Sequence, residues 1–200
     1  MTSEAETIIG QFQAGNERYR KGCIENHNFP EEFSHLQEVK AQPKAMVLTC
    51  MDSRIAPELI FDVHLGEIFD ARVAGNIVNP DIIASMKLAC LVANTRLIIV
   101  MGHTDCKAIS SAIDEIQLGS FTGLLTQIQP SIAASRDHHP ELEATSSNPN
   151  FVNVVARDNI TRNIQRIRDF SPLLRQREEA GELSLVPCLY HVETGEAEFF

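Results

Sequence analysis

Segments of strand length alternate along this chain with segments that have helical character. Short segments bounded by polar, glycine or proline residues predict β-strands at residues 45–49, 67–73 and 97–102. The last of these is a continuous apolar run, which is typical of a strand covered on both faces. Two shorter strands are expected at the end of the chain, in LSLVPCLYH and AEFF, with Thr194-Gly195 as the turn between them.

Helical patterns occupy most of the remaining chain. Ser3 and Glu6 have the spacing of a capping box, so the first helix is expected to begin at Ser3. The longer helical segments are predicted at residues 3–21, 80–93, 107–117, 121–136 and 150–170.

The segment between the first helix and the first strand is polar. Residues 22–34 are rich in Asn, His, Pro and Glu and predict a loop, which leads into a short helix near His35–Lys40. After the first strand, Pro57 suits the first turn of another helix.

The alternation of strands and helices predicts the fold class. We expect an α/β fold with a mostly parallel central β-sheet flanked by helices. No repeat and no linker divides the sequence, so residues 1–200 are expected to form a single domain with an N-terminal helical arm over about residues 1–42. In such sheets, ligands bind beyond the carboxyl ends of the strands, where the strand order reverses.

Composition narrows the possible partners. The net charge of −10 argues against nucleic acid or an anionic membrane surface as the main partner. No apolar stretch approaches the roughly 18 residues that span a bilayer, and the acidic start MTSEAETIIG lacks the features of a signal peptide. We therefore expect a cytoplasmic protein whose five cysteines stay reduced. An odd cysteine count makes a disulfide framework a poor explanation and leaves metal binding or catalysis open.

The ends of two predicted strands carry candidate metal ligands. Cys50 follows the first strand, and His103 and Cys106, three residues apart, follow the apolar run at 97–102. Both strand ends should meet in one crevice. Two cysteines and one histidine suit tetrahedral Zn²⁺, and three protein ligands leave one position open, as in catalytic zinc sites.

Each of these residues has a purely structural alternative. A buried cysteine is usually a small hydrophobic residue, and a histidine at a turn is usually only hydrogen-bonded. The shared crevice favours ligation for the three residues above. The other three cysteines are assigned to structure: Cys90 on an apolar helix face, Cys188 in a terminal strand and Cys23 in a polar loop.

Asp52 and Arg54 lie two residues apart, so in an extended segment their side chains would point the same way. A surface ion pair of little energetic consequence is one interpretation. Beside a metal, Arg54 would keep Asp52 ionised. Asp52 could then accept the proton of a zinc-bound hydroxide, or move onto the metal as a fourth ligand and close the site.

The motif Cys50-x-Asp52-x-Arg54 followed by His103-x-x-Cys106 resembles the signature of the β-class carbonic anhydrases. The stretches GNERYRKG, PELIFD, LGEIFDARVAGN and YHVETGEAEFF are similar to that family too.

The resemblance implies a zinc enzyme that interconverts CO₂ and bicarbonate by attack of zinc-bound hydroxide. It also implies Cys50, His103 and Cys106 as ligands, Asp52 and Arg54 beside them, and an α/β domain whose first helices embrace a partner chain in homodimers or larger assemblies. Two thiolates cancel the formal charge of the ion, so the rate is expected to rise toward alkaline pH as hydroxide forms.

Two departures from the family pattern keep alternatives open. Lys107 stands where the family commonly has Gly, and Val63-His64 replaces a pair that commonly includes Gln. Lys107 is either a solvent-facing lysine in the first turn of a helix or part of an altered pocket rim. A hydrolase for carbonyl sulfide (COS) or carbon disulfide (CS₂) on the same zinc site therefore remains the alternative, with a non-catalytic zinc-binding relative as a weaker one. A redox or phosphatase role for Cys50 fails because the chain has neither C-x-x-C nor C-x₅-R at this position.

Overall fold

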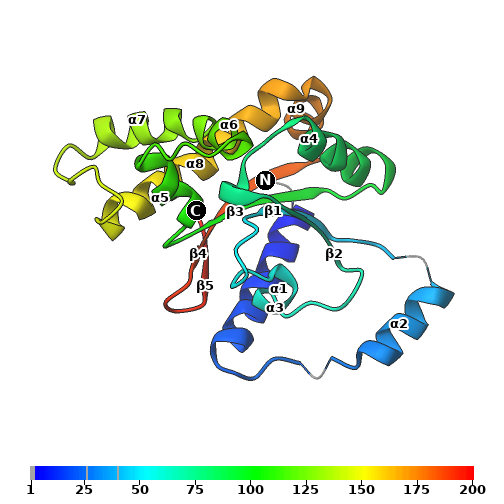
Figure 1. Ribbon diagram of the computed structural model, residues 1–200. Helices are drawn as coiled ribbons and strands as arrows, with labels where there is room; N and C mark the ends of the chain where they lie inside the picture. Colours follow the sequence, from blue (N-terminus) through cyan, green and yellow to red (C-terminus); the bar gives the residue numbers. More distant parts are fainter. Residues whose placement is uncertain (1–2, 26, 40) are drawn as a thin grey trace.

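The computed structural model describes residues 3–25, 27–39 and 41–200. The strands of this part of the chain form one sheet in the order β2-β1-β3-β4-β5 (Figure 1). Neighbouring strands are parallel except for the β4–β5 pair, which is antiparallel. The strand bounds are β1 Ala45–Thr49, β2 Ile68–Arg72, β3 Leu97–His103, β4 Ser184–His191 and β5 Glu196–Phe199. The mostly parallel sheet confirms the predicted α/β fold class.

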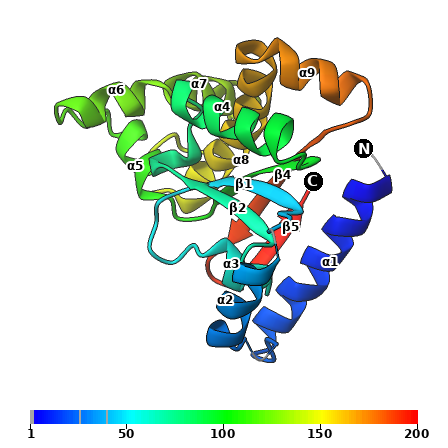
Figure 2. The same cartoon turned by 90° about the vertical axis from the view of Figure 1, so that its right-hand side faces the viewer.

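Helices cover both faces of the sheet (Figures 1 and 2). The larger face packs against α4, α5 and α8, and the other face packs against α1 and α3. The helix bounds are α1 Ser3–Arg20, α2 Phe29–Glu38, α3 Pro57–Ile60, α4 Pro80–Lys87, α5 Lys107–Ile113, α6 Ser120–Thr126, α7 Gln129–His138, α8 Pro149–Phe170 and α9 Pro172–Glu179. Shorter turns are a 3₁₀ turn at Ala74–Asn76 and a π-helical turn at Leu88–Val92.

The two central strands are buried on both faces. In β1, Met46 and Leu48 join the cluster on the larger face, whereas Ala45 and Val47 join the cluster on the other face. All residues of β1 and β3 are buried. Double-sided burial explains why their sequences read as continuous apolar runs rather than as alternating patterns.

The helix predictions need correction at several places. The helix predicted over 107–117 ends at Ile113. Helix α2 begins at Phe29, within the predicted 22–34 loop, because Pro30 occupies its first turn and acidic side chains follow; the predicted end at Lys40 lies outside the described residues. The single helix predicted for 121–136 is two helices, with Pro130 in the first turn of the second. Helix α9 was not predicted, and it begins after the Ser171 side chain accepts a hydrogen bond from the backbone N–H of Leu174.

The strand order creates the expected crevice. Strands β2 and β3 pair with opposite sides of β1, so the chain reverses its direction of progress across the sheet between β1 and β3. Ligand sites of open α/β sheets lie beyond the carboxyl ends of strands at such a point. No helix within the described ranges is long and apolar enough to cross a membrane.

Candidate metal centre

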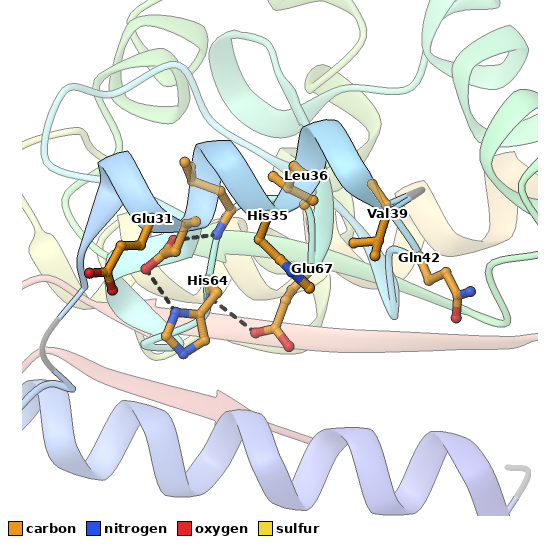
Figure 3. A pocket seen from close by; sticks show the side chains of 11 residues that line it. Glu31, His35, Leu36, Val39, Gln42, His64 and Glu67 are labelled. Atoms are coloured by element: carbon orange, nitrogen blue, oxygen red, sulfur yellow. Dashed lines mark hydrogen bonds and ion pairs between the residues drawn. The ribbon is translucent and has the colours of Figure 1, made fainter.

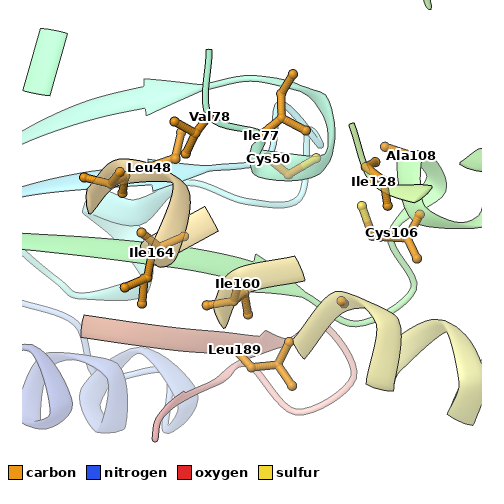
Figure 4. Packing of buried hydrophobic residues seen from close by; sticks show 14 of the residues in the cluster. Leu48, Cys50, Ile77, Val78, Cys106, Ala108, Ile128, Ile160, Ile164 and Leu189 are labelled. Atoms are coloured by element: carbon orange, nitrogen blue, oxygen red, sulfur yellow. The ribbon is translucent and has the colours of Figure 1, made fainter. Parts of the chain in front are cut away.

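Cys50, His103 and Cys106 meet at the carboxyl ends of β1 and β3. Cys50 directly follows β1, His103 is the last residue of β3, and Cys106 immediately precedes α5. Their exposed fractions are 4%, 1% and 2%, and their donor atoms all lie within 4.8 Å of one another. Figure 4 shows both cysteines at the edge of the apolar cluster that packs on this face of the sheet.

The imidazole of His103 is oriented for ligation. Its Nδ1 lies 2.8 Å from the carbonyl oxygen of Thr104. Because a carbonyl can only accept, Nδ1 carries the hydrogen and Nε2 presents a lone pair. Nε2 is buried and has no hydrogen-bond partner within the described part of the chain. A buried acceptor left unpaired is costly, and a metal ion would satisfy it.

The two thiols influence each other's pKa. The neighbouring Cys106 lowers the pKa of Cys50, against the opposing influence of burial. The proximity of Cys50, together with burial, raises the pKa of Cys106. A divalent cation would displace the thiol protons and bind both sulfurs as thiolates. With the free Nε2 of His103, the donor set fits zinc.

Arg54 holds the carboxylate of Asp52 in a fork. Nε and the backbone N–H of Arg54 both donate to Oδ1 of Asp52 at 3.0 Å, and Nη2 donates to Oδ2 at 2.9 Å. These hydrogen bonds keep the pKa of Asp52 far below its usual range, against the effect of burial. The structure therefore places Asp52 and Arg54 together, with an ionised Asp52 beside Cys50 in the same pocket.

Asp105 and Arg72 complete the site and were not singled out from the sequence. Nη1 of Arg54 donates to Oδ2 of Asp105 at 2.9 Å, which joins the loop after β1 to the loop after β3. Arg72, in β2, donates to the backbone carbonyls of Cys50 and Asp52. The signal available for Asp105 was its place between two candidate ligands, whereas nothing in the sequence marks Arg72.

A pocket of about 220 Å³ opens beside Cys50 and Asp52. Its walls include the apolar side chains of Ala74, Ala108 and Phe121, and Lys107 lines it as well. The Lys107 side chain is 77% exposed, and its Nζ lies 3.2 Å from Oδ1 of Asp105. Lys107 therefore belongs to the rim of the pocket, where most of its side chain faces solvent.

The remaining cysteines lie elsewhere. Cys90 is buried in the cluster on the larger face and Cys188 in the cluster on the other face. Cys23 is exposed, and its thiol lies 3.5 Å from the carbonyl oxygen of Arg18. Their positions confirm that these three cysteines are not part of the site.

Comparison with known proteins connects this geometry to a family. The family model described as carbonic anhydrase matches residues 45–197. Carbonic anhydrase 2 of Mycobacterium tuberculosis is 27% identical over 197 residues, which cover 93% of this chain and 88% of that protein. A carbonic anhydrase of Pseudomonas aeruginosa is 32% identical over 162 residues, which cover 76% of this chain and 71% of that protein.

Solved structures share the fold. The β-carbonic anhydrase CcaA superposes with a TM-score of 0.77 at 24% identity, covering 96% of this chain and 94% of that one. A tetrameric β-carbonic anhydrase of Sordaria macrospora gives a TM-score of 0.74 at 22% identity, covering 86% of this chain and 87% of that one. At these identities, the superpositions are evidence for the fold.

Proposed function

Because the chain belongs to the β-class carbonic anhydrase family, we propose that Cys50, His103 and Cys106 hold its catalytic zinc ion and that Asp52 and Arg54 act beside it. The protein is a zinc-dependent carbonate dehydratase that interconverts CO₂ and bicarbonate. The observation that carries the site assignment is the buried, unpartnered Nε2 of His103 in a group with Cys50 and Cys106 whose donor atoms all lie within 4.8 Å of one another.

When bound, zinc supplies the Lewis acidity that produces a hydroxide nucleophile near neutral pH. The chain supplies orientation. Oδ1 of Asp52 already accepts two hydrogen bonds from Arg54, whereas Oδ2 accepts one. A carboxylate oxygen has two lone pairs, so Oδ2 is the atom that can accept the proton of the attacking group. The hydrogen bonds from Arg54 keep Asp52 an acceptor by holding its pKa low.

The pocket suits an uncharged substrate. Ala74, Ala108 and Phe121 provide apolar walls beside Cys50 and Asp52, and an apolar wall holds CO₂ without competing for hydrogen bonds. Arg54 fixes the position of the Asp52 carboxylate through hydrogen bonds to both oxygens. Movement of Asp52 onto the metal would break these hydrogen bonds, which supports an open fourth metal position. No contact in the pocket favours COS or CS₂ over CO₂.

Replacing one proposed ligand tests the assignment. We expect Cys106→Ser to lose most of its zinc and to hydrate CO₂ more than about 10³-fold more slowly, because ordinary water is far less acidic than zinc-activated water. Cys23→Ser, at an exposed cysteine outside the site, should retain zinc and rate. Stopped-flow CO₂ hydration with metal analysis measures both variants.

The same assay distinguishes the alternatives. The wild-type rate should rise between about pH 7 and 9, and release of hydrogen sulfide from COS should be much slower than CO₂ hydration. A zinc-retaining, fully active Cys106→Ser enzyme would contradict the ligand assignment. Faster turnover of COS than of CO₂ would contradict the substrate assignment.

We further propose that the protein works in the cytoplasm as a homodimer or larger homo-oligomer. All five cysteines are free thiols, which suits a reducing compartment. The β-carbonic anhydrases of Sordaria macrospora are described as tetrameric. Exposed apolar side chains on α2, Phe29 and Phe33, offer surface that a second chain could cover.

A further inference from the structure

A second group of potential metal ligands lies in the N-terminal arm. His27 comes from the loop before α2, Glu32 from α2, and His64 from the loop after α3. Their donor atoms all lie within 4.8 Å of one another. None of the three lines the pocket beside Cys50, so this group is separate from the catalytic centre.

The spacing of the donor atoms suits a tetrahedral ion. Oε1 of Glu32 lies 2.9 Å from Nδ1 of His64 and 3.4 Å from Nδ1 of His27. An ion with bonds of about 2.0–2.1 Å separates tetrahedral donors by about 3.3–3.4 Å. Figure 3 shows the ring of His64 beneath α2, with its hydrogen bond to a carboxylate of that helix. Only a small adjustment of His64 would be needed to admit the ion.

His27 carries the strongest indication of an absent cation. Its Nε2 lies 2.9 Å from Oδ1 of Asp62; the carboxylate is an acceptor, so Nε2 holds the hydrogen and Nδ1 presents a lone pair. The His27 side chain is only 8% exposed, and its Nδ1 has no hydrogen-bond partner among the residues that the structure describes. That lone pair faces Oε1 of Glu32, another acceptor, at 3.4 Å, and two facing acceptors need either a proton or a metal cation between them.

Asp62 is placed as an outer-shell group. Its side chain is fully buried and accepts hydrogen bonds from Arg18, the backbone N–H of Glu25, and His27. Burial alone would raise the pKa of Asp62, but these hydrogen bonds outweigh it and lower the pKa. Histidine ligands commonly donate their second ring N–H to such a carboxylate, which fixes the tautomer and increases ligand basicity.

The surroundings of the His27–Glu32–His64 group are acidic. Helix α2 has few other contacts within the chain. The carboxylate of Glu25 lies 3.4 Å from Nε2 of His64, and Glu67 accepts a hydrogen bond from the backbone N–H of His64. Within one chain, helix α2 buries none of its side chains, so few apolar contacts hold it to the rest of that chain. An ion shared by His27, Glu32 and His64 would link α2 to the loop after α3.

We propose that His27, Glu32 and His64 form a second binding site for Zn²⁺, which attaches α2 to the body of the protein. Two imidazoles and one carboxylate are ligands that zinc accepts. His64 and Glu32 line an open pocket of about 670 Å³, so water can reach the remaining position of the ion. The site is structural and does not depend on the assignment of the catalytic centre.

Metal content and spectroscopy test the second site with zinc and cobalt as the probes. After equilibration with excess Zn²⁺ and removal of free metal, the wild-type chain should hold about two ions, and His27→Ala and His64→Ala about one. His35→Ala is the matched control, because His35 lies in the same helix and pocket but outside the ligand group, and it should keep both ions. Asp62→Asn should weaken binding at this site about 10–100-fold.

Cobalt separates the two sites within one sample. Co²⁺ bound to Cys50 and Cys106 gives thiolate charge-transfer absorption, whereas Co²⁺ in the arm should add visible absorption without it. The His27→Ala variant should lose only the second signal, and its arm at residues 21–42 should be cleaved faster by protease. Equal metal content in the His27→Ala and His35→Ala variants, or a wild-type cobalt spectrum identical to that of His27→Ala, would overturn the proposal and identify protons as the occupants of the cluster.

Discussion

Two groups of side chains in this molecule could each hold a metal, and they differ in what supports them. The proposed ligands Cys50, His103 and Cys106 adjoin β1 and β3, whose residues are all buried. The arm group at His27, Glu32 and His64 depends on two loops and on α2, which buries no side chain. The first group is therefore positioned by the hydrophobic core before any ion binds, whereas the second depends on its own polar contacts.

The difference in structural support suits the two groups to different roles. A catalytic site needs reacting groups held within fractions of an ångström, which buried strands provide. The arm site can fulfil a structural role with looser support, because its ion itself supplies the missing attachment. Local opening should be frequent in α2 and rare in β1 and β3, since opening is easiest where few apolar contacts must be broken.

Apart from loss of a proposed zinc ligand, the largest predicted effect concerns the Asp52–Arg54 pair at the rigid site. We expect Asp52→Asn to lower kcat/KM for CO₂ hydration about 100-fold. The amide removes the negative charge beside Arg54 and replaces one acceptor oxygen with an NH₂ donor. Folding should be little affected, since the core strands are unchanged. Stopped-flow kinetics and urea unfolding measure the two quantities.

Arg54→Lys is the companion variant. Lysine keeps the positive charge but loses the paired guanidinium hydrogen bonds to Asp52 and the hydrogen bond to Asp105. We therefore expect kcat/KM to fall about tenfold. Wild-type kcat/KM in Asp52→Asn would show that the carboxylate takes no part in the reaction.

The same contrast explains what the sequence could reveal. The strands next to Cys50 and His103 were predictable because burial on both faces leaves a continuous apolar run. Helix α2 does carry Phe29, Phe33 and Leu36 at the i, i+4, i+7 spacing of a helix, but the polar composition of residues 22–34 hid this signal. Its start at Phe29 was therefore placed too late, in a segment expected to be a loop.

Individual site residues follow the same logic. The proposed zinc ligands could be singled out because two short motifs adjoin strand ends, where parallel topology brings them together. His27, Glu32 and His64 have no motif spacing, since they meet only through the packing of three separate segments. The role of Asp105 depends on the reach of Arg54 across the crevice, which no local pattern specifies.

A second prediction concerns a substitution in β3, the strand that supports His103. Gly102 precedes His103 in β3, and a Cβ there would lie 2.8 Å from Cδ1 and Cγ1 of Ile160 in α8. Gly102→Ala should therefore lower the free energy of unfolding by about 1–3 kcal/mol, since well-packed cores resist added methyl groups. Urea unfolding monitored by circular dichroism measures the change.

Gly10→Ala is the matched control. Gly10 lies inside α1, and a Cβ there would meet nothing within 4 Å. The substitution should stabilise the protein by about 0.5–1 kcal/mol, because alanine is the better helix former. If the two substitutions changed the free energy of unfolding equally, Ile160 in α8 would be able to move away from β3 at little cost. The packing that supports His103 would then be less rigid than we propose.

The smallest predicted effect concerns Lys107, the departure from the family pattern at the rim. Its ammonium group lies 3.2 Å from Oδ1 of Asp105 and its side chain is 77% exposed, so the ion pair is worth about 0–1 kcal/mol. We expect Lys107→Ala to change kcat/KM less than about fivefold, equally for CO₂ hydration and bicarbonate dehydration because their ratio is fixed by the reaction equilibrium.

The role of Lys107 can be tested by measuring turnover at high ionic strength and with COS as a second substrate. A purely electrostatic effect should disappear at an ionic strength of about 1 M, and Lys107→Arg should behave as wild type. The ratio of COS to CO₂ turnover should also stay within about fivefold of the wild-type ratio. A larger change in that ratio would move Lys107 from the rim into the substrate-binding surface, because an exposed charge alone discriminates poorly between two uncharged molecules of similar shape.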